Sequence, residues 1–207
     1  MLRRHYGGPD YFVLYGRAIS LFKAIVMKTS GNYIPDVFPM GRLPVDVVAN
    51  NALILPYITY CNIVWGNCSS TKINSILLLQ KRALRVVTNS HYLSNSEPLF
   101  HQLKRLKIND IHTFQTAIFM HKYTFNQLPQ SFYNFFTLNS NIHSYPTRRS
   151  SDYHLENPKI VLAQKSLKHH GPDVWNSLPE NLKLCTSLNS FKIQAKKNIL
   201  QQYSINS

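Results

Sequence analysis

Cationic side chains in three clusters are the residues whose type and spacing best suit chemistry, here the binding of phosphate groups. Lysine and arginine neutralise the phosphates of nucleic acids, and two tyrosines near the third cluster, Tyr145 and Tyr153, could stack on unpaired bases. Charged clusters also form ordinary solvated helix faces, and tyrosines also fold back onto the protein body, so both interpretations stay open. The candidate nucleic-acid-binding residues are Lys81, Arg82 and Arg85, then Lys104, Arg105 and Lys107, then Arg148 and Arg149.

The carboxylates are poorly arranged for catalysis. Polymerase chemistry needs two metal ions held by paired carboxylates, and no two acidic residues of this chain are neighbours. Asp152 with Glu156, and Asp173 with Glu180, come nearest to an acid and base pair. In a basic protein, however, such carboxylates are usually charge partners of lysine and arginine. We therefore predict no catalytic residue in this chain.

The histidines and cysteines form no recognisable metal or nucleophile motif. His169 and His170 could be combined with His143 or His154, but no HxxxH or CxxH spacing supports a metal site. Cys61 lies in an apolar run without a cationic neighbour, which predicts a buried hydrophobic residue. GxxxxGK[ST], GxGxxG and GxSxG are all absent from the sequence. We predict no metal ligand and no cofactor.

The overall charge indicates a polyanionic partner. The 207 residues carry a formal charge of +14, and residues 69–207 hold 17 of the 23 basic side chains but only 6 acidic ones. Charge alone does not separate nucleic acid from an anionic membrane surface. The most apolar long segment, Tyr11 to Met27, is interrupted by Arg17 and Lys23 and is shorter than the about 18 apolar residues of a membrane span. Three cysteines without a CxxC pair fit a reducing compartment, so we expect an intracellular protein of nucleus or cytoplasm without a membrane segment.

Apolar periodicity indicates that helices position the first two clusters. Ser70 or Thr71 can cap a helix that runs to about Thr88, with an apolar stripe centred on Ile73. At about 100° per residue, the three cations of the first cluster fall together, away from this stripe. A short helix opened by Pro98 ends in the second cluster. Further predicted helices span residues 43–55 with a break at Pro56, then 57–65, then 111–126 capped by Asn109 or Asp110, and about 187–201.

The predicted fold class is mainly α, a helical bundle with an irregular basic insert and a C-terminal helix. Residues 1–42 are rich in glycine and proline and form a poorly defined N-terminal segment. Residues 43–136 form the helical body. Residues 137–170 lose helical periodicity and form a basic loop or a pair of short strands. Residues 171–207 comprise a proline-bounded turn with Trp175 and the last helix.

Several phrases of this chain, taken in order, resemble the thumb and post-thumb region of LINE-type (jockey-like) non-LTR retrotransposon reverse transcriptases. The resemblance runs from about Leu43 to the end, and the ordered set is far more specific than any single phrase. The phrases are LILPYITYCNIVWG, LLLQKRALRVVTNS, EPLFHQLKRLKINDIHTFQTAIFMHKY, IHSYPTRRSSDYHL and KSLKHHGPDVWNSLPENLKLCTSLNSFKIQAKKNIL.

This resemblance implies a thumb-like helical body that binds RNA or DNA, including an RNA–DNA hybrid. It places the first cluster on the helix that follows a primer–template duplex, and Arg148 and Arg149 in the C-terminal extension. The family polymerises with Mg²⁺, but no fingers, palm, paired aspartates or endonuclease precede residue 43. We therefore expect this chain alone to be inactive as a polymerase and to take no small-molecule substrate. The alternative is a decayed or recruited fragment that acts as a structural or interaction module.

Overall fold

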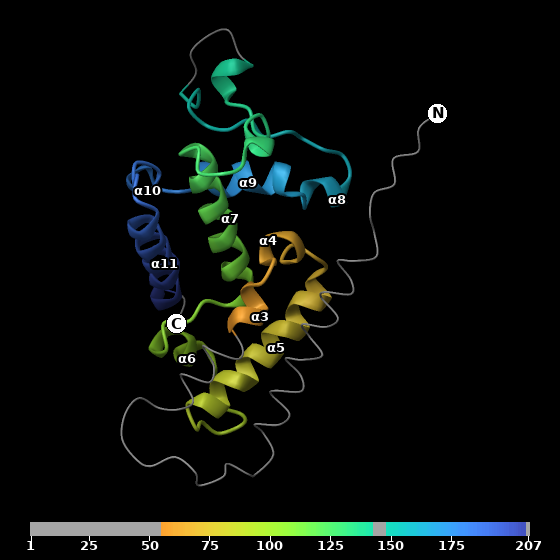
Figure 1. The fold of residues 1–207 in the computed structure, drawn as a ribbon. Helices are drawn as coiled ribbons and strands as arrows, with labels where there is room; N and C mark the ends of the chain where they lie inside the picture. The colour runs from red at the N-terminus through yellow and green to blue at the C-terminus, as the bar shows by residue number, and fades with distance from the viewer. Residues whose placement is uncertain (1–54, 143–147, 206–207) are drawn as a thin grey trace.

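The structure is a computed structural model that describes residues 55–142 and 148–205, and its fold is mainly α, as predicted (Figure 1). The predicted N-terminal segment and residues 43–54 of the helical body, together with His143 and Tyr145, lie outside the described residues. The elements are α3 Leu55–Thr59, α4 Asn62–Trp65, α5 Ser70–Val87, α6 Glu97–Gln102, α7 Ile108–Thr124, the 3-10 turns η2 Gln130–Phe132 and η3 Asn139–Asn141, α8 Val161–Gln164, α9 Leu167–Asn176, α10 Glu180–Lys183 and α11 Leu188–Ile205.

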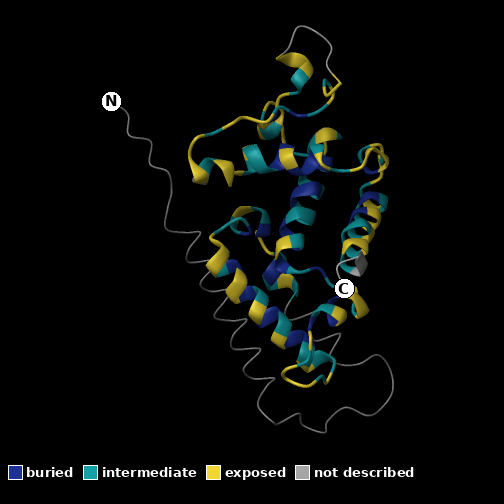
Figure 2. Ribbon diagram, turned by 180° about the vertical axis from the view of Figure 1, so that it is seen from behind, coloured by how far each residue is buried: buried dark blue, intermediate teal, exposed yellow. Residues whose placement is uncertain are grey.

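Helix α7 is the centre of the fold, with α5, α9 and α11 packed around it (Figure 1). Its first half contributes Ile108 and Ile111 to an apolar cluster with α3 and α5. Its second half contributes Ala117 and Met120 to another cluster with α9 and α11. Figure 2 shows how much of α7 is buried or partly buried. A helix covered on several sides has no single apolar stripe, which is why its periodicity is weak in the sequence.

Helix α5 agrees closely with its prediction, whereas α6 and α7 differ at their ends. Helix α6 stops at Gln102 because Lys104 adopts a left-handed conformation, with φ of 51°, and the Arg105 N–H donates to the Phe100 carbonyl at 2.8 Å. The side chain of Gln80, buried on α5, then donates to the Leu106 carbonyl at 2.8 Å and accepts from the Ile108 N–H at 3.1 Å. This clamp fixes where α7 begins, three residues before the predicted start.

The break between the first two described helices lies at Cys61. Pro56 lies within α3, and its carbonyl accepts a hydrogen bond from the Tyr60 N–H at 2.9 Å. Cys61 has a φ of 49° and is exposed, so the prediction that it is a buried hydrophobic residue is wrong. Trp65, from the same phrase, is partly buried against the apolar cluster of α3, α5 and α7. Its Nε1–H donates to the Tyr60 carbonyl at 2.7 Å.

The predicted turn at GPDVWNSLP is instead the second half of helix α9. Gly171, Pro172, Val174 and Trp175 are all buried, and α9 makes the most extensive helix contact of α7. A Cβ at position 171 would lie 2.9 Å from the Met120 Sδ atom, so glycine allows the two helices to approach closely. Burial of this face offsets the helix hydrogen bond that Pro172 cannot make.

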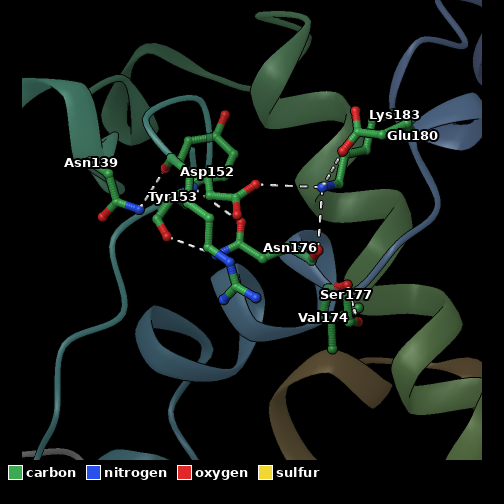
Figure 3. A network of polar contacts seen from close by, with 9 residues as sticks. Asn139, Asp152, Tyr153, Val174, Asn176, Ser177, Glu180 and Lys183 are labelled. Carbon is green, nitrogen blue, oxygen red and sulfur yellow. Dashed lines mark hydrogen bonds and ion pairs between the residues drawn. The ribbon is translucent and has the colours of Figure 1, made fainter. Parts of the chain in front are cut away.

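The irregular insert is held by backbone pairing and by α9. Among the described residues it contains no strand, and one isolated bridge joins Leu138 and Tyr153. The Asn176 side chain of α9 accepts from the Tyr153 N–H at 3.0 Å and donates to the Tyr153 carbonyl at 2.8 Å (Figure 3). Lys183 extends this network to Asp152 at 3.5 Å. The insert is therefore fastened to the helical body at Tyr153.

Candidate nucleic-acid interface

The first two cationic clusters meet at one carboxylate. Glu97, at the start of α6, pairs through Oε1 with Lys81 Nζ at 3.6 Å and through Oε2 with Lys107 Nζ at 2.5 Å. Lys107 and Lys81 together hold the pKa of Glu97 below its usual range. Lys107 also lies over the ring of Tyr203, with its Nζ 4.6 Å from the centroid. These two lysines thus combine a structural role with any role in binding.

The remaining members of the first cluster differ in their surroundings. Arg85 donates its Nε–H to the Ser94 carbonyl at 2.9 Å and thereby holds the connection between α5 and α6. Arg82 is exposed, and no ion pair involves it among the described residues. Of the three cations on this helix face, Arg82 is therefore the one best placed to meet a phosphate.

The second cluster is divided by burial. Lys104 is exposed, whereas Arg105 is partly buried and its Nε atom has no hydrogen-bond partner among the described residues. Burial lowers the pKa of the Arg105 guanidinium. Lys196, from α11, lies beside both of them, and the sequence analysis missed this neighbour. Nothing in the local sequence could have found it, because about ninety residues separate Lys196 from Arg105.

The third cluster lies at the far end of α7 from α6 (Figure 1). Arg148 and Arg149 are both exposed, and the Arg149 carbonyl accepts from the Asn139 side chain at 2.9 Å. Tyr153, proposed above as a base-stacking residue, is 7% exposed and donates or accepts a hydrogen bond with the Thr124 hydroxyl at 2.9 Å. Of the two interpretations left open for Tyr153, the structure shows the second, because the ring folds back onto the protein body as part of the apolar cluster of α7, α9 and α11.

Most of the carboxylates considered for catalysis form ion pairs with lysines. Lys183 lies 3.5 Å from Asp152 and 3.0 Å from Glu180, and Lys168 lies 2.6 Å from Glu156. These three acidic residues are charge partners, as the sequence analysis expected. Within residues 55–142 and 148–205, no group of three or more histidine, cysteine or acidic residues is arranged to hold a metal ion.

A stacked histidine pair, with His112 buried and His170 partly buried, is a second feature that the sequence analysis missed. His112 donates from Nδ1 to the Asn62 carbonyl at 3.1 Å, and its ring stacks on His170 at 5.0 Å between centroids. Burial, together with the nearby His170, lowers the pKa of His112 to about 4. Burial also lowers the pKa of His170 and of His121, which donates from Nε2 to the Cys185 carbonyl at 2.7 Å. Helical spacing could have predicted that His112 and His121 are buried, because each follows a buried α7 residue by four positions.

Comparison with protein-family models, with curated proteins and with solved structures found no match to this chain. None of the described helices is long and apolar enough to cross a membrane.

Proposed function

We propose that this chain is the nucleic-acid-binding C-terminal part of a LINE-type reverse transcriptase, with a thumb-like helical body and without the catalytic palm. The observation that carries the proposal is the surplus of cations left after ion pairing. Of the 17 lysines and arginines in residues 69–207, the ion pairs among described residues occupy four. The exposed cations outside these pairs include Arg82, Lys104, Arg148 and Arg149.

Two further features support nucleic acid as the polyanion. The ordered resemblance to the reverse-transcriptase family covers about four fifths of the chain, and the described residues are mainly helical, which is the fold class expected of a thumb. The surplus cations lie both near α6 and near the third cluster, at opposite ends of α7 (Figure 1). A nucleic acid is long enough to contact both sites, which a small anion cannot do.

The salt dependence of binding tests the proposal. An RNA–DNA hybrid duplex should bind the full chain with log Kd that varies steeply with log salt concentration. If about six cations each neutralise one phosphate, the slope of log K against log salt should be about −5. A slope near zero in a folded protein would contradict the proposal and would favour a structural or interaction module instead. Primer extension with Mg²⁺ should yield no product.

Charge variants separate specific contacts from general attraction. Arg82→Gln should reduce the magnitude of the salt slope by about 1, and Arg148→Gln with Arg149→Gln should reduce it by about 2. Lys168→Gln is the matched control, because it removes one exposed charge that Glu156 already pairs. This control should leave the slope nearly unchanged. Equal effects of all these variants would mean that only net charge matters.

A further inference from the structure

A cavity of about 130 Å³ lies among α3, α5, α7, α11 and the connection from α6 to α7. Half of its twelve lining residues are apolar, including Leu84, Ile111 and Phe114. Three are cationic, namely Lys104, Arg105 and Lys196, and none of the described lining residues is acidic. No ion pair found among the described residues involves any of these three cations. The cavity therefore combines an apolar wall with uncompensated positive charge.

The backbone holds Arg105 at this cavity. Its own N–H donates to the Phe100 carbonyl at 2.8 Å, and the carbonyl of the next residue, Leu106, accepts from Gln80 at 2.8 Å. The Arg105 Nε atom is buried and has no hydrogen-bond partner among the described residues. Because this atom is covered by protein, an anion in the cavity would meet the guanidinium through its terminal N–H groups.

Lys196 adds a second constrained charge from α11. It is partly buried, and its pKa is lowered by burial and by the proximity of Arg105 and Lys104. Holding like charges together in a partly apolar site is unfavourable unless an anion compensates them. A bound carboxylate or phosphate group would pair with the Arg105 guanidinium and neutralise Lys196 together.

Of the three uncharged polar side chains of the wall, Gln80 and Thr59 have little left to offer a ligand, whereas Gln115 has no side-chain hydrogen bond among the described residues. Gln80 uses its amide nitrogen and its oxygen on the backbone clamp. The Thr59 hydroxyl donates to the Leu55 carbonyl at 2.9 Å. A ligand rich in hydroxyl groups, such as a sugar, would find only Gln115 as an uncharged partner and would leave most of its own polar groups unpaired here. The wall instead suits an apolar body of about benzene size, since an engineered apolar cavity of about 150 Å³ holds benzene.

We propose that this cavity binds a small amphipathic anion, with a carboxylate or phosphate head between Arg105 and Lys196 and a compact apolar body against Leu84, Ile111 and Phe114. Lys104 and Arg105 also belong to the second cationic cluster, but the binding of a small anion in this cavity does not require that the chain bind nucleic acid.

Calorimetric titration of the full chain tests the site with benzoate, phenyl phosphate, inorganic phosphate and benzyl alcohol. Benzoate or phenyl phosphate should bind saturably, and comparison of the two identifies the preferred head group. Inorganic phosphate and benzyl alcohol should each bind at least about tenfold more weakly, because one lacks the apolar body and the other lacks the charge. Equal binding of either control compound, or no saturable binding of the two amphipathic anions, would overturn the proposal.

Two variants locate the binding site. Arg105→Met and Lys196→Met keep side-chain length and should each weaken binding of the preferred anion by about tenfold or more. Lys168→Gln, an exposed change on α9 outside the cavity lining, is the matched control and should bind as the unmodified chain does. Far-UV circular dichroism verifies that each variant is folded. If one variant fails to fold, the other still decides, and unchanged affinity in a folded Lys196→Met protein would contradict the proposal.

Discussion

Gly66 brings the backbone at the end of α4 against the buried side chains of His112 and Asn62. A Cβ at this position would lie 2.6 Å from the Asn62 carbonyl oxygen and would also overlap the His112 Nδ1 atom. Neither neighbour can move freely, since these two groups are hydrogen-bonded to each other. Gly66→Ala should therefore lower the free energy of unfolding by about 3 kcal/mol, measured by urea denaturation.

Gly171→Ala is the matched control for this substitution. Its Cβ would lie 2.9 Å from the Met120 Sδ atom and 3.1 Å from Phe136 Cζ. Methionine is flexible and can shift its sulfur, and the loss of a helical glycine is itself favourable. Gly171→Ala should cost clearly less than Gly66→Ala. The reverse order would show that the α4 backbone is easier to displace than the contact between α7 and α9.

The buried histidines should make the protein sensitive to mild acid. In the folded state the pKa of His112 is lowered to about 4, whereas the unfolded chain titrates near 6.5. As the pH falls below about 6.5, His112 therefore becomes protonated in the unfolded state while it stays neutral in the folded state. The free energy of unfolding decreases until the pH reaches about 4. This shift corresponds to about 3 kcal/mol for His112, and His121 and His170 act in the same direction.

Urea denaturation between pH 7.5 and about 4.5 measures this dependence. His112→Gln removes the titrating group, keeps a side chain that can donate to the Asn62 carbonyl and should reduce the slope of stability against pH. NMR titration of the His112 ring should show a midpoint well below 6.5. A normal midpoint with a folded protein would mean that water or a counter-charge reaches this ring.

At the scale of the elements, the sequence predicted best those helices that have one buried face. Helix α5 shows a regular apolar stripe, so its limits were predicted within one or two residues, and α11 was also located. The predicted caps of α5, Ser70 or Thr71, are instead its first two residues, and the N-cap residue Ser69 makes no side-chain cap hydrogen bond. Helix α9 was missed because Gly171 and Pro172 normally mark a turn, and only the contact with α7 explains why a helix accommodates them. Cys61 was misassigned because an apolar run hides a left-handed residue between two short helices.

The sequence predicted which cations of the candidate site lie together on one helix, but not which groups from other segments lie beside them. Local spacing correctly grouped Lys81, Arg82 and Arg85 on one side of α5. It could not reveal that Glu97 pairs with Lys81, or that Lys196 lies beside Arg105, because those contacts join segments distant in the chain. The number of cations available to a ligand depends on such partners, so it follows from packing and not from composition.

The junction between α9 and the basic insert depends on Asn176. Asn176→Ala would leave the Tyr153 N–H and carbonyl without their side-chain partner, which should cost about 2 kcal/mol. Because Tyr153 fastens the insert (Figure 3), amide hydrogen exchange should rise most at residues 150–154 and at Asn139.

Asn181→Ala is the control for this prediction, since Asn181 is exposed on α10 and no hydrogen bond of its side chain was found among the described residues. This variant should leave both stability and exchange nearly unchanged. Faster exchange spread evenly over all helices of the Asn176→Ala protein would indicate global destabilisation and would contradict a local fastening role.

For the molecule as a whole, α7 couples the two main apolar clusters. The chain has two tryptophans, with Trp65 packed against the first cluster and Trp175 buried in the second. Because α7 contributes to both clusters, neither should unfold alone. In each single-tryptophan variant, Trp65→Phe or Trp175→Phe, the urea midpoint measured by tryptophan fluorescence should therefore equal the midpoint measured by circular dichroism.

Each tryptophan variant serves as the control for the other. The substitution itself changes the urea midpoint, but it should shift the fluorescence and circular dichroism midpoints of that protein equally. Fluorescence of Trp65 that changes before the helical signal is lost would mean that the end containing α3 and α5 unfolds separately. Such a result would make α7 two independent halves and not one coupling element.

Besides the two main apolar clusters, a small apolar cluster of Leu84, Leu99 and Phe100 joins α5 to α6. Helix α11 reaches all three, with Phe191 in the second main cluster, Ile199 against the first and Tyr203 against the small one. On the ribosome, α5 and α7 are synthesised long before this helix. At translation rates of about 5–20 residues per second, on the order of ten seconds pass between the synthesis of their apolar faces and the synthesis of α11, which packs against them. The nascent chain is therefore a natural client for chaperones until α11 has emerged from the exit tunnel.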